Sequence, residues 1–433
     1  MHQLIIHHLG PIQDCNISIK QTTVLTGYQA SGKSTIAKAI YFFRTIKDDI
    51  YNLVQRNKLD RSFANDTIHE QEENHTRSFR GDFERCVRSK FLNTFGTSYS
   101  MDSDMLISYR YSADVSVTIS LREATTFLGQ NFVWVDYPQT VRSFLKQIED
   151  DIPNENELKQ KLAELFDDSY ETVYIPAGRS ALTVLGSLFS YFYSTMDDSQ
   201  KRLLDSCTRN YVERVMKLRP QFSNGLEGLL EGVSENIQVK QIYVEALNLI
   251  ENILKGRYTV SEGEERIWID RNHYTKINFA SSGQQEVVWI VNMLFYYLVT
   301  DNKGFFIIEE PESNLFPESQ KLIVELITLV SNCNNAVLIT THSPYVLGTI
   351  NNMIYAGIVG ALAPERVDKI ISHAKWIDTD KFDAFFVKEG TAVQCVDQEL
   401  MQIDNALLDR ISHVINSDYD KLFDIENESG EEF

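Results

Sequence analysis

The sequence lacks the features that mark membrane and secreted proteins. No apolar run approaches the roughly 20 residues that a membrane-spanning helix needs. The N-terminus opens on the apolar pattern Leu4–Ile6, without the charged and then apolar order of a secretion signal. The five cysteines are scattered, odd in number and without metal-ligand spacing. These absences predict a soluble, cytoplasmic protein with reduced thiols and no membrane partner.

The chain also lacks an excess of positive charge. Its formal net charge is −20, from 41 basic and 61 acidic residues among 433, which argues against coating of a nucleic acid. The densest basic segment is interrupted by acids and comprises Arg77, Arg80, Asp82, Glu84, Arg85, Arg88 and Lys90. A solvated helix face and a local basic groove both fit this pattern. Charge therefore neither indicates nor excludes a nucleic-acid partner.

A glycine-containing segment near the N-terminus predicts a phosphate-binding loop. It follows an apolar strand pattern at residues 22–25 and precedes an amphipathic helix pattern that ends near Phe43, which is the setting this motif requires. Its residues are Gly27, Tyr28, Gln29, Ala30, Ser31, Gly32, Lys33, Ser34 and Thr35.

The chemistry of this loop follows from its residue types. Gly27 and Gly32 allow backbone N–H groups to converge on a β-phosphate, and the following helix adds the dipole of its N-terminus. We expect Lys33 to reach the β- and γ-phosphates and the Ser34 hydroxyl to bind Mg²⁺. Thr35 is expected to approach the α-phosphate.

Two further apolar runs end in polar residues that suit catalysis. Phe305–Ile308 is continuously apolar, as in a strand covered on both faces, and leads into Glu309 and Glu310. Carboxylates at such a strand end lie where ligands bind in open α/β sheets. By position, Glu309 supports Mg²⁺ and Glu310 polarises the attacking water, although helix-capping acids are an alternative. His342 follows the run Ala336–Thr340, and we expect it to hydrogen-bond the γ-phosphate.

A fourth motif predicts a partner subunit. Ser281, Ser282, Gly283 and Gln284 precede a helix pattern over residues 285–297, which makes an anion site at a helix start. An ordinary N-cap is the alternative interpretation. Because the phosphate-binding loop already holds the phosphates of its own nucleotide, we expect this second set of donors to act on the nucleotide of another subunit.

In this order, the four motifs resemble those of ABC/SMC-type ATPase heads. The resemblance is to the group that includes RecF, the double-strand-break-repair ATPases and the overcoming-lysogenization-defect (OLD) nucleases. The run from Glu309 to Pro317 matches that group's EEPE-x-x-L-x-P pattern, and Leu9–Ile12 and Tyr174–Ser180 are similarly typical. Glu309 stands where ABC ATPases usually have Asp, and Ser313–Phe316 lacks the acidic end of the family's subunit-contact loop.

The resemblance implies a fold, cofactors and partners. The fold is α/β, an ABC-type ATPase head with a P-loop mixed sheet, an antiparallel β subdomain, helical insertions and a small C-terminal extension. The cofactors are ATP and Mg²⁺, and the assembly is a homodimer or higher homo-oligomer with composite ATP sites. For stand-alone members it implies an anti-phage sensor or scaffold that controls a separate effector, a nuclease or toxin.

Two other functions are weighed against that one. A RecF/SMC-like ATPase of DNA repair or chromosome maintenance shares the same motifs. An ABC transporter subunit shares several of them, but the EEPE run and the large helical insertions weigh against it.

The patterns divide the chain into four parts. No heptad repeat persists in the second part, so we expect a short helical insertion there in place of a coiled coil. The parts are ATPase lobe I at 1–180 with a helical insertion at about 45–98, the helical insertion at 181–255, ATPase lobe II at 256–360, and a C-terminal docking or assembly element at 361–433.

Further predictions concern individual segments and Arg179. Antiparallel strands are predicted at Met105–Tyr111, Val115–Leu121 and Phe132–Val135. Phe385–Gly390 superficially resembles the first acidic strand of a Toprim nuclease, but the remaining tail is too short for that domain. Arg179 is expected either to contact phosphate, to couple the helical region to the site, or to form a structural ion pair.

Overall fold

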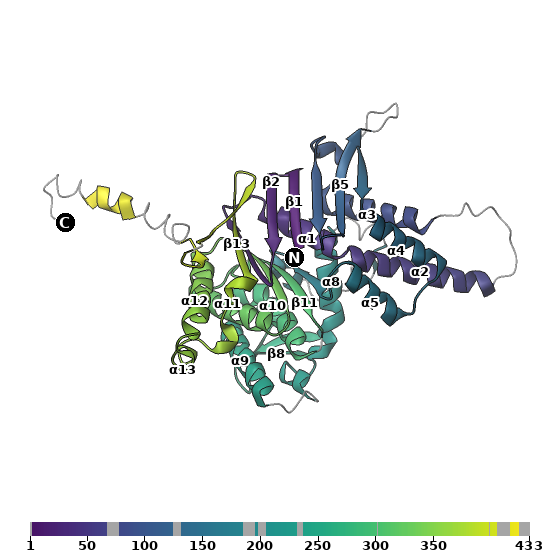
Figure 1. The fold of residues 1–433 in the computed structure, drawn as a ribbon. Helices are drawn as coiled ribbons and strands as arrows, with labels where there is room; N and C mark the ends of the chain where they lie inside the picture. Colours follow the sequence, from purple (N-terminus) through teal and green to yellow (C-terminus); the bar gives the residue numbers. More distant parts are fainter. Residues whose placement is uncertain are drawn as a thin grey trace.

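A mixed sheet of 11 strands forms the centre of this computed structural model (Figure 1). The structure describes residues 2–66, 78–123, 131–184, 195–197, 205–231, 237–300, 302–397, 399–404 and 416–423. In spatial order the strands are β6 (Asn131–Asp136), β5 (Ser116–Glu123), β4 (Leu106–Arg110), β1 (His2–Leu9), β2 (Ile12–Ile19), β14 (Thr391–Gln394), β13 (Phe382–Lys388), β3 (Thr22–Gly27), β12 (Ala336–Thr341), β11 (Gly304–Glu309) and β7 (Glu171–Ile175).

Helices cover this sheet and extend from its edge (Figure 1). None of those in the described ranges is long and apolar enough to cross a membrane. The helices with stated bounds are α1 (Lys33–Arg44), α2 (Ile46–Asp66), α3 (Phe79–Phe95), α4 (Gln139–Asp150), α5 (Glu155–Leu165), α8 (Ser206–Leu218), α9 (Ile237–Leu254), α10 (Ser282–Val299), α11 (Pro317–Asn332), α12 (Pro344–Gly360) and α13 (Pro364–Asp368).

The central strands are apolar throughout because both of their faces are buried. In β11, Phe305 and Ile307 belong to the hydrophobic core that contains α1. Phe306 and Ile308 point to the opposite core, which α10, α11 and α12 share. Successive side chains of a strand alternate between the two faces, so a strand buried on both faces must be apolar at every position.

The predicted antiparallel strands are present as β4, β5 and β6, and they pair antiparallel with one another. They are not a separate sheet, because β4 pairs with β1 and β1 with β2. The β2 strand then pairs with β14 at a single register position, Thr391 with Asp14. The P-loop sheet and the antiparallel strands are therefore one hydrogen-bonded sheet, joined at a narrow contact.

The strands that join the two halves come from the C-terminal part of the chain. In β13, Phe382–Val387 pair in parallel with Thr22–Gly27 of β3, and β14 returns antiparallel to β13. Within the predicted docking or assembly element over 361–433, residues 382–394 therefore belong to the central sheet. The Toprim-like segment Phe385–Gly390 is the end of β13 and its turn. Residues 405–415 and 424–433 lie outside the described residues.

The helical insertions were predicted correctly in type. The insertion at about 45–98 contains α2 and α3, and residues 67–77 between them lie outside the described residues. Within 181–255, α9 packs along α10 and α11. Beyond it, β8 (Arg257–Ser261) and β9 (Glu264–Trp268) form an antiparallel hairpin, to which β10 (Tyr274–Lys276) adds a third strand.

Candidate functional site

The phosphate-binding loop joins β3 to α1 and depends on two glycines. Gly27 and Gly32 have φ angles of 145° and 105°, which side chains rarely adopt. A Cβ on Gly27 would lie 2.2 Å from the carbonyl oxygen of Val387, and one on Gly32 would lie 2.3 Å from Ile12 Cδ1. Glycine is therefore required by both the backbone angle and the close approach of neighbouring strands.

Lys33 is the first residue of α1 and folds back over the loop. Its Nζ donates to the carbonyl oxygens of Gly27 at 2.9 Å and Tyr28 at 2.8 Å. Burial lowers the pKa of Lys33, and the charges of Glu310, Glu312 and Glu309 oppose that shift. Since these carboxylates are close enough to act on the pKa of Lys33, the loop and the acidic turn after β11 face the same site.

The two predicted carboxylates occupy different environments. Glu309 ends β11 and is buried, with Oε2 accepting from the Ala177 amide at 3.2 Å. Its Oε1 is buried and has no hydrogen-bond partner among the described residues. Glu310 is the more open of the two, with a side chain that is 34% exposed. Glu309 therefore resembles a metal ligand whose position is fixed by its surroundings, whereas Glu310 is open enough to reach a substrate.

Glu310 lies on a strained backbone. Its φ angle is 43°, in the left-handed region that a residue other than glycine occupies at a cost of about 1–3 kcal/mol. Its amide donates to the carbonyl oxygen of Thr340 at 2.9 Å, which ties the turn to β12. Its Oε1 lies 3.5 Å from Nδ1 of His342, and Ser313 Oγ donates to its Oε2 at 3.3 Å. The structure thus brings together the predicted water-polarising residue and the predicted phosphate sensor.

Glu312 is a third acid that the sequence prediction left out of the site. It is buried, and its Oε1 accepts from Thr341 Oγ1 at 2.5 Å and from the His342 amide at 3.2 Å. Its role is to connect the acidic turn with the end of β12 and so to orient His342. The EEPE run carried this signal, since it places a second acid two residues after Glu310.

The predicted anion site at Ser281–Gln284 forms the start of α10, where a capping box closes it. Gln284 Oε1 accepts from the Ser281 amide at 3.0 Å, and Gln284 Nε2 donates to the Leu254 carbonyl oxygen at 2.7 Å. Gln284 is therefore engaged within its own chain, as the N-cap alternative expects. Ser282 is exposed, so the predicted anion site reduces to Ser282 and the first amides of α10.

Gly283 packs against the turn that follows the acidic motif. A Cβ at this position would lie 2.7 Å from the carbonyl oxygen of Asn314. The start of α10 and the segment Ser313–Phe316 therefore lie on the same face of the molecule.

The β13–β14 turn contributes a wall of the site that the sequence did not predict. A cavity of about 360 Å³ is lined by Tyr28, Gln29, Ala30 and Ser31 of the loop, by Pro11, and by Lys388, Glu389 and Gly390 of the turn. The Gly390 carbonyl oxygen accepts from the amides of Gln13 at 2.8 Å and Asp14 at 3.1 Å. The turn is therefore fixed to the start of β2 beside the loop.

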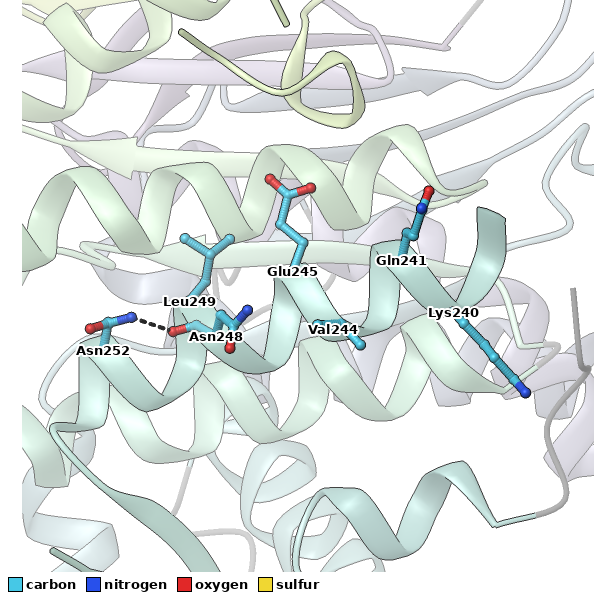
Figure 2. Close-up of a pocket in the computed structure, with 7 residues that line it drawn as sticks. All are labelled: Lys240, Gln241, Val244, Glu245, Asn248, Leu249 and Asn252. Atoms are coloured by element: carbon cyan, nitrogen blue, oxygen red, sulfur yellow. Dashed lines mark hydrogen bonds between the residues drawn. The ribbon is translucent and has the colours of Figure 1, made fainter. Parts of the chain in front are cut away.

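A larger hollow of about 470 Å³ lies along one helix, α9 (Figure 2). Glu245 in this hollow is paired with Lys375 at 2.9 Å, and Asn252 Nδ2 donates to the Asn248 carbonyl oxygen at 2.8 Å. Its lining consists of Lys240, Gln241, Val244, Glu245, Asn248, Leu249 and Asn252. None of the predicted site residues lines this hollow, so the volume of a cavity does not identify the functional site in this protein.

With this geometry described, residues 1–347 match the family model of an AAA ATPase domain. The chain belongs to this family. An ATPase domain therefore occupies most of the sequence, and the family normally uses ATP with Mg²⁺. The β13–β14 hairpin lies beyond the matched range. No curated protein matches the sequence.

Solved structures of similar fold are distant in sequence. The SMC head domain from Thermotoga maritima is 11% identical with a TM-score of 0.38, over 90% of this chain and 97% of that one. An Smc head bound to the C-terminal winged-helix domain of ScpA is 13% identical with a TM-score of 0.42, over 92% and 98%. An Smc head bound to the C-terminal domain of ScpA from Pyrococcus furiosus is 11% identical with a TM-score of 0.40, over 91% and 96%.

We predict that Gly27→Ala abolishes ATP binding. The added Cβ would force β3 away from Val387 of β13, and alanine at a φ of 145° should destabilise the fold by more than about 1 kcal/mol. Calorimetric titration with ATP and urea unfolding measure the two effects. The control is Gly348→Ala within α12, where a Cβ meets nothing within 4 Å. Equal ATP affinity in Gly27→Ala and the control would contradict this prediction.

Proposed function

We infer that this ATPase hydrolyses ATP with Mg²⁺ in a site shared by two copies of the chain, and that the closed pair controls a separate effector. The observation that carries the proposal is the convergence of Lys33, Glu309, Glu310 and His342. These residues come from the carboxyl ends of β3, β11 and β12, which are parallel neighbours. Parallel strands of an α/β sheet bind ligands at that edge.

Each residue of the site has a role that its environment supports. Glu310 is open and held by a strained turn, so it accepts the hydrogen bond of an attacking water and polarises it. His342 extends the site beside it, with a side chain that is 55% exposed. Lys33 exchanges its two carbonyl contacts for phosphate oxygens.

The donor set also fits a magnesium ion. Glu309 offers a buried carboxylate oxygen without a partner among the described residues, and Ser34 offers an exposed hydroxyl. Oxygen ligands of this kind are those that Mg²⁺ prefers. When bound, the ion would neutralise charge on the β- and γ-phosphates.

The second half of the site is proposed to come from a partner copy. Ser282 is exposed at the N-terminus of an 18-residue helix. Phe279 and Phe316 flank it as exposed aromatic side chains. An isologous pair would place each Ser282 against the nucleotide of the other chain and bury both aromatic residues.

The proposed effector role rests on the resemblance to the OLD-like group. Within that group we favour an anti-phage sensor or scaffold that controls a separate nuclease. The DNA-clamp alternative gains no support from the basic segment. Arg80 and Arg88 pair with Glu84, Arg85 pairs with Asp82, and Lys90 pairs with Asp49 at 2.6 Å. The exposed pairs of Arg80 and Arg85 support the solvated-helix interpretation, whereas Lys90 is largely buried against α2. Arg77 lies outside the described residues.

We predict that Glu310→Gln binds ATP normally but hydrolyses it roughly 10²–10⁴-fold more slowly, because an amide cannot act as the base. Lys33→Ala should instead abolish binding. Calorimetric titration and phosphate release distinguish the two variants. Turnover at the wild-type rate in Glu310→Gln would mean that another group is the base.

We predict that Lys33→Ala and Ser282→Asp chains, each inactive alone, recover ATPase activity when mixed. The mixed pair contains one intact loop facing one intact Ser282. Ser282→Asp is preferable to Gly283→Asp, since a side chain at Gly283 would strike Asn314 of its own chain. An Asp at the first position of a helix is also compatible with its dipole.

The matched control for this mixture is Gln139→Asp, which adds the same charge at the exposed first position of α4. It should remain fully active alone. Full activity of Ser282→Asp alone would reject the shared site, as would mixed pairs that form and stay inactive.

We predict that the product of a neighbouring nuclease gene binds the ATP-closed pair. Native mass spectrometry of the Glu310→Gln chain with ATP should show a complex whose mass includes both proteins. Lys33→Ala with ATP is the control, because it should not close. A nuclease that binds both variants equally would contradict control by ATP, and a gene neighbourhood devoted to repair would favour the alternative.

A further inference from the structure

Arg179 is a fully buried cation that contacts both catalytic carboxylate residues through their backbone. One terminal nitrogen donates to the carbonyl oxygens of Pro176 at 2.5 Å and Glu309 at 2.6 Å, and the other donates to the carbonyl oxygen of Glu310 at 3.1 Å. It makes no direct contact with either carboxylate. Arg179 therefore holds the peptide groups before and after Glu310, within the turn that orients its side chain.

The same guanidinium binds the helix that starts at Ser282. Its Nε donates to the Glu286 carbonyl oxygen at 3.0 Å and lies 3.4 Å from Glu286 Oε2. The Glu286 carboxylate also accepts from the amides of Arg179 and Ser180, each at 3.1 Å. Glu286 is thus fixed by both the side chain and the backbone of the segment that follows β7.

A buried charge at this position needs an explanation beyond packing. Burial lowers the pKa of Arg179, and Glu286 opposes the shift. Removing a guanidinium from water is expensive, and apolar residues often pack such a position with equal stability. An apolar side chain cannot provide the planar set of hydrogen-bond donors that reaches both α10 and the turn after β11.

The turn that Arg179 holds is the strained one. Glu310 has a φ angle of 43°, and such conformations persist where surrounding contacts over-determine them. Arg179 supplies contacts on both sides of that residue, and the neighbouring Ala177 amide holds the Glu309 side chain. The short segment that contains Ala177 and Arg179 thereby orients both Glu309 and Glu310.

The helix side of the contact leads to the predicted partner surface. Glu286 lies four residues after Ser282 in α10, one helical turn further along the same face. A displacement of the start of α10 is therefore transmitted to Glu286 and from there to Arg179. The path from Ser282 to Glu310 thus runs along α10 to Glu286 and then through the side chains of Glu286 and Arg179.

We propose that Arg179 is a positioning residue that couples engagement of α10 by a partner copy to the orientation of Glu310. This inference rests on the proposed function, in which Glu310 is the base and Ser282 faces the partner's nucleotide. Arg179 acts through backbone carbonyl groups and touches no substrate. In the open chain it keeps the strained turn, and closure of the pair adjusts that turn through Glu286.

The test is a double-mutant cycle between Arg179→Lys and Glu310→Gln. Lysine retains the charge opposite Glu286 but cannot reach four carbonyl groups as a planar fork. Arg179→Lys alone should retain ATP affinity and ATP-dependent pairing in sedimentation, while kcat falls by about 10²-fold, as expected for a misplaced catalytic group. In the Glu310→Gln background, the same change should have no further effect on turnover.

Arg214→Lys is the matched control for a purely structural role. Arg214 is a partly buried arginine that, like Arg179, joins neighbouring elements. It contacts Glu171 and the Tyr297 hydroxyl, each at 2.6 Å, and does not contact the acidic turn. It should lower the thermal midpoint without changing kcat. If Arg179→Lys fails to fold, Glu286→Gln takes its place in the cycle. Its amide oxygen can still accept from one of the Arg179 and Ser180 amides, whereas its NH2 group cannot accept from the other.

The outcomes separate the inference from the function on which it rests. Equal losses of turnover in both backgrounds would overturn the positioning role and leave Glu310 as the base. A loss of ATP affinity equal to the loss of kcat would overturn it in favour of general structural damage. Wild-type turnover in Glu310→Gln would overturn the base assignment and this inference together.

Discussion

The parallel pairing of β3, β12 and β11 is the constraint on which the site depends. The hydrogen-bonded register places Gly27, Thr341 and Glu309 at the ends of adjacent strands. The groups that a single chain is proposed to contribute around its own nucleotide lie at one of those ends or just after it, in the loop before α1, in the acidic turn or in the residues after β12. Ser282, which is proposed to act on the partner's nucleotide, lies instead at the start of α10. The geometry of the site is therefore a property of the sheet, and loops supply only the last few residues.

Local motifs were predictable because their chemistry depends on neighbours in sequence. The strand–loop–helix order around Lys33, the buried strand before Glu309 and the strands β4, β5 and β6 all have local signatures, and the structure contains each of these elements. The family match confirms an ATPase domain over residues 1–347. The roles assigned to individual residues remain predictions, since geometry alone does not test them.

The rest depended on contacts between distant parts of the chain. The pattern of Phe382–Lys388 predicts an apolar strand, but no local feature states that it pairs with Thr22–Gly27. Arg179 could not be assigned because its partners, Glu286 and the turn at Glu310, lie more than 100 residues away. Gln284 is different, since a serine followed three residues later by glutamine is a known capping-box signature and was available from sequence.

The insertion of β13 also makes the site depend on both ends of the chain. Without β13, one edge of β3 would expose unpaired N–H and C=O groups beside the phosphate-binding loop, and such edges pair with other chains. The close approach of Val387 to Gly27 shows that the loop is shaped against this strand and is not merely next to it. Residues 382–394 therefore belong to the packing that shapes the loop. Because they lie beyond the range that the family model matches, the proposed nucleotide site includes surroundings from outside the matched ATPase domain.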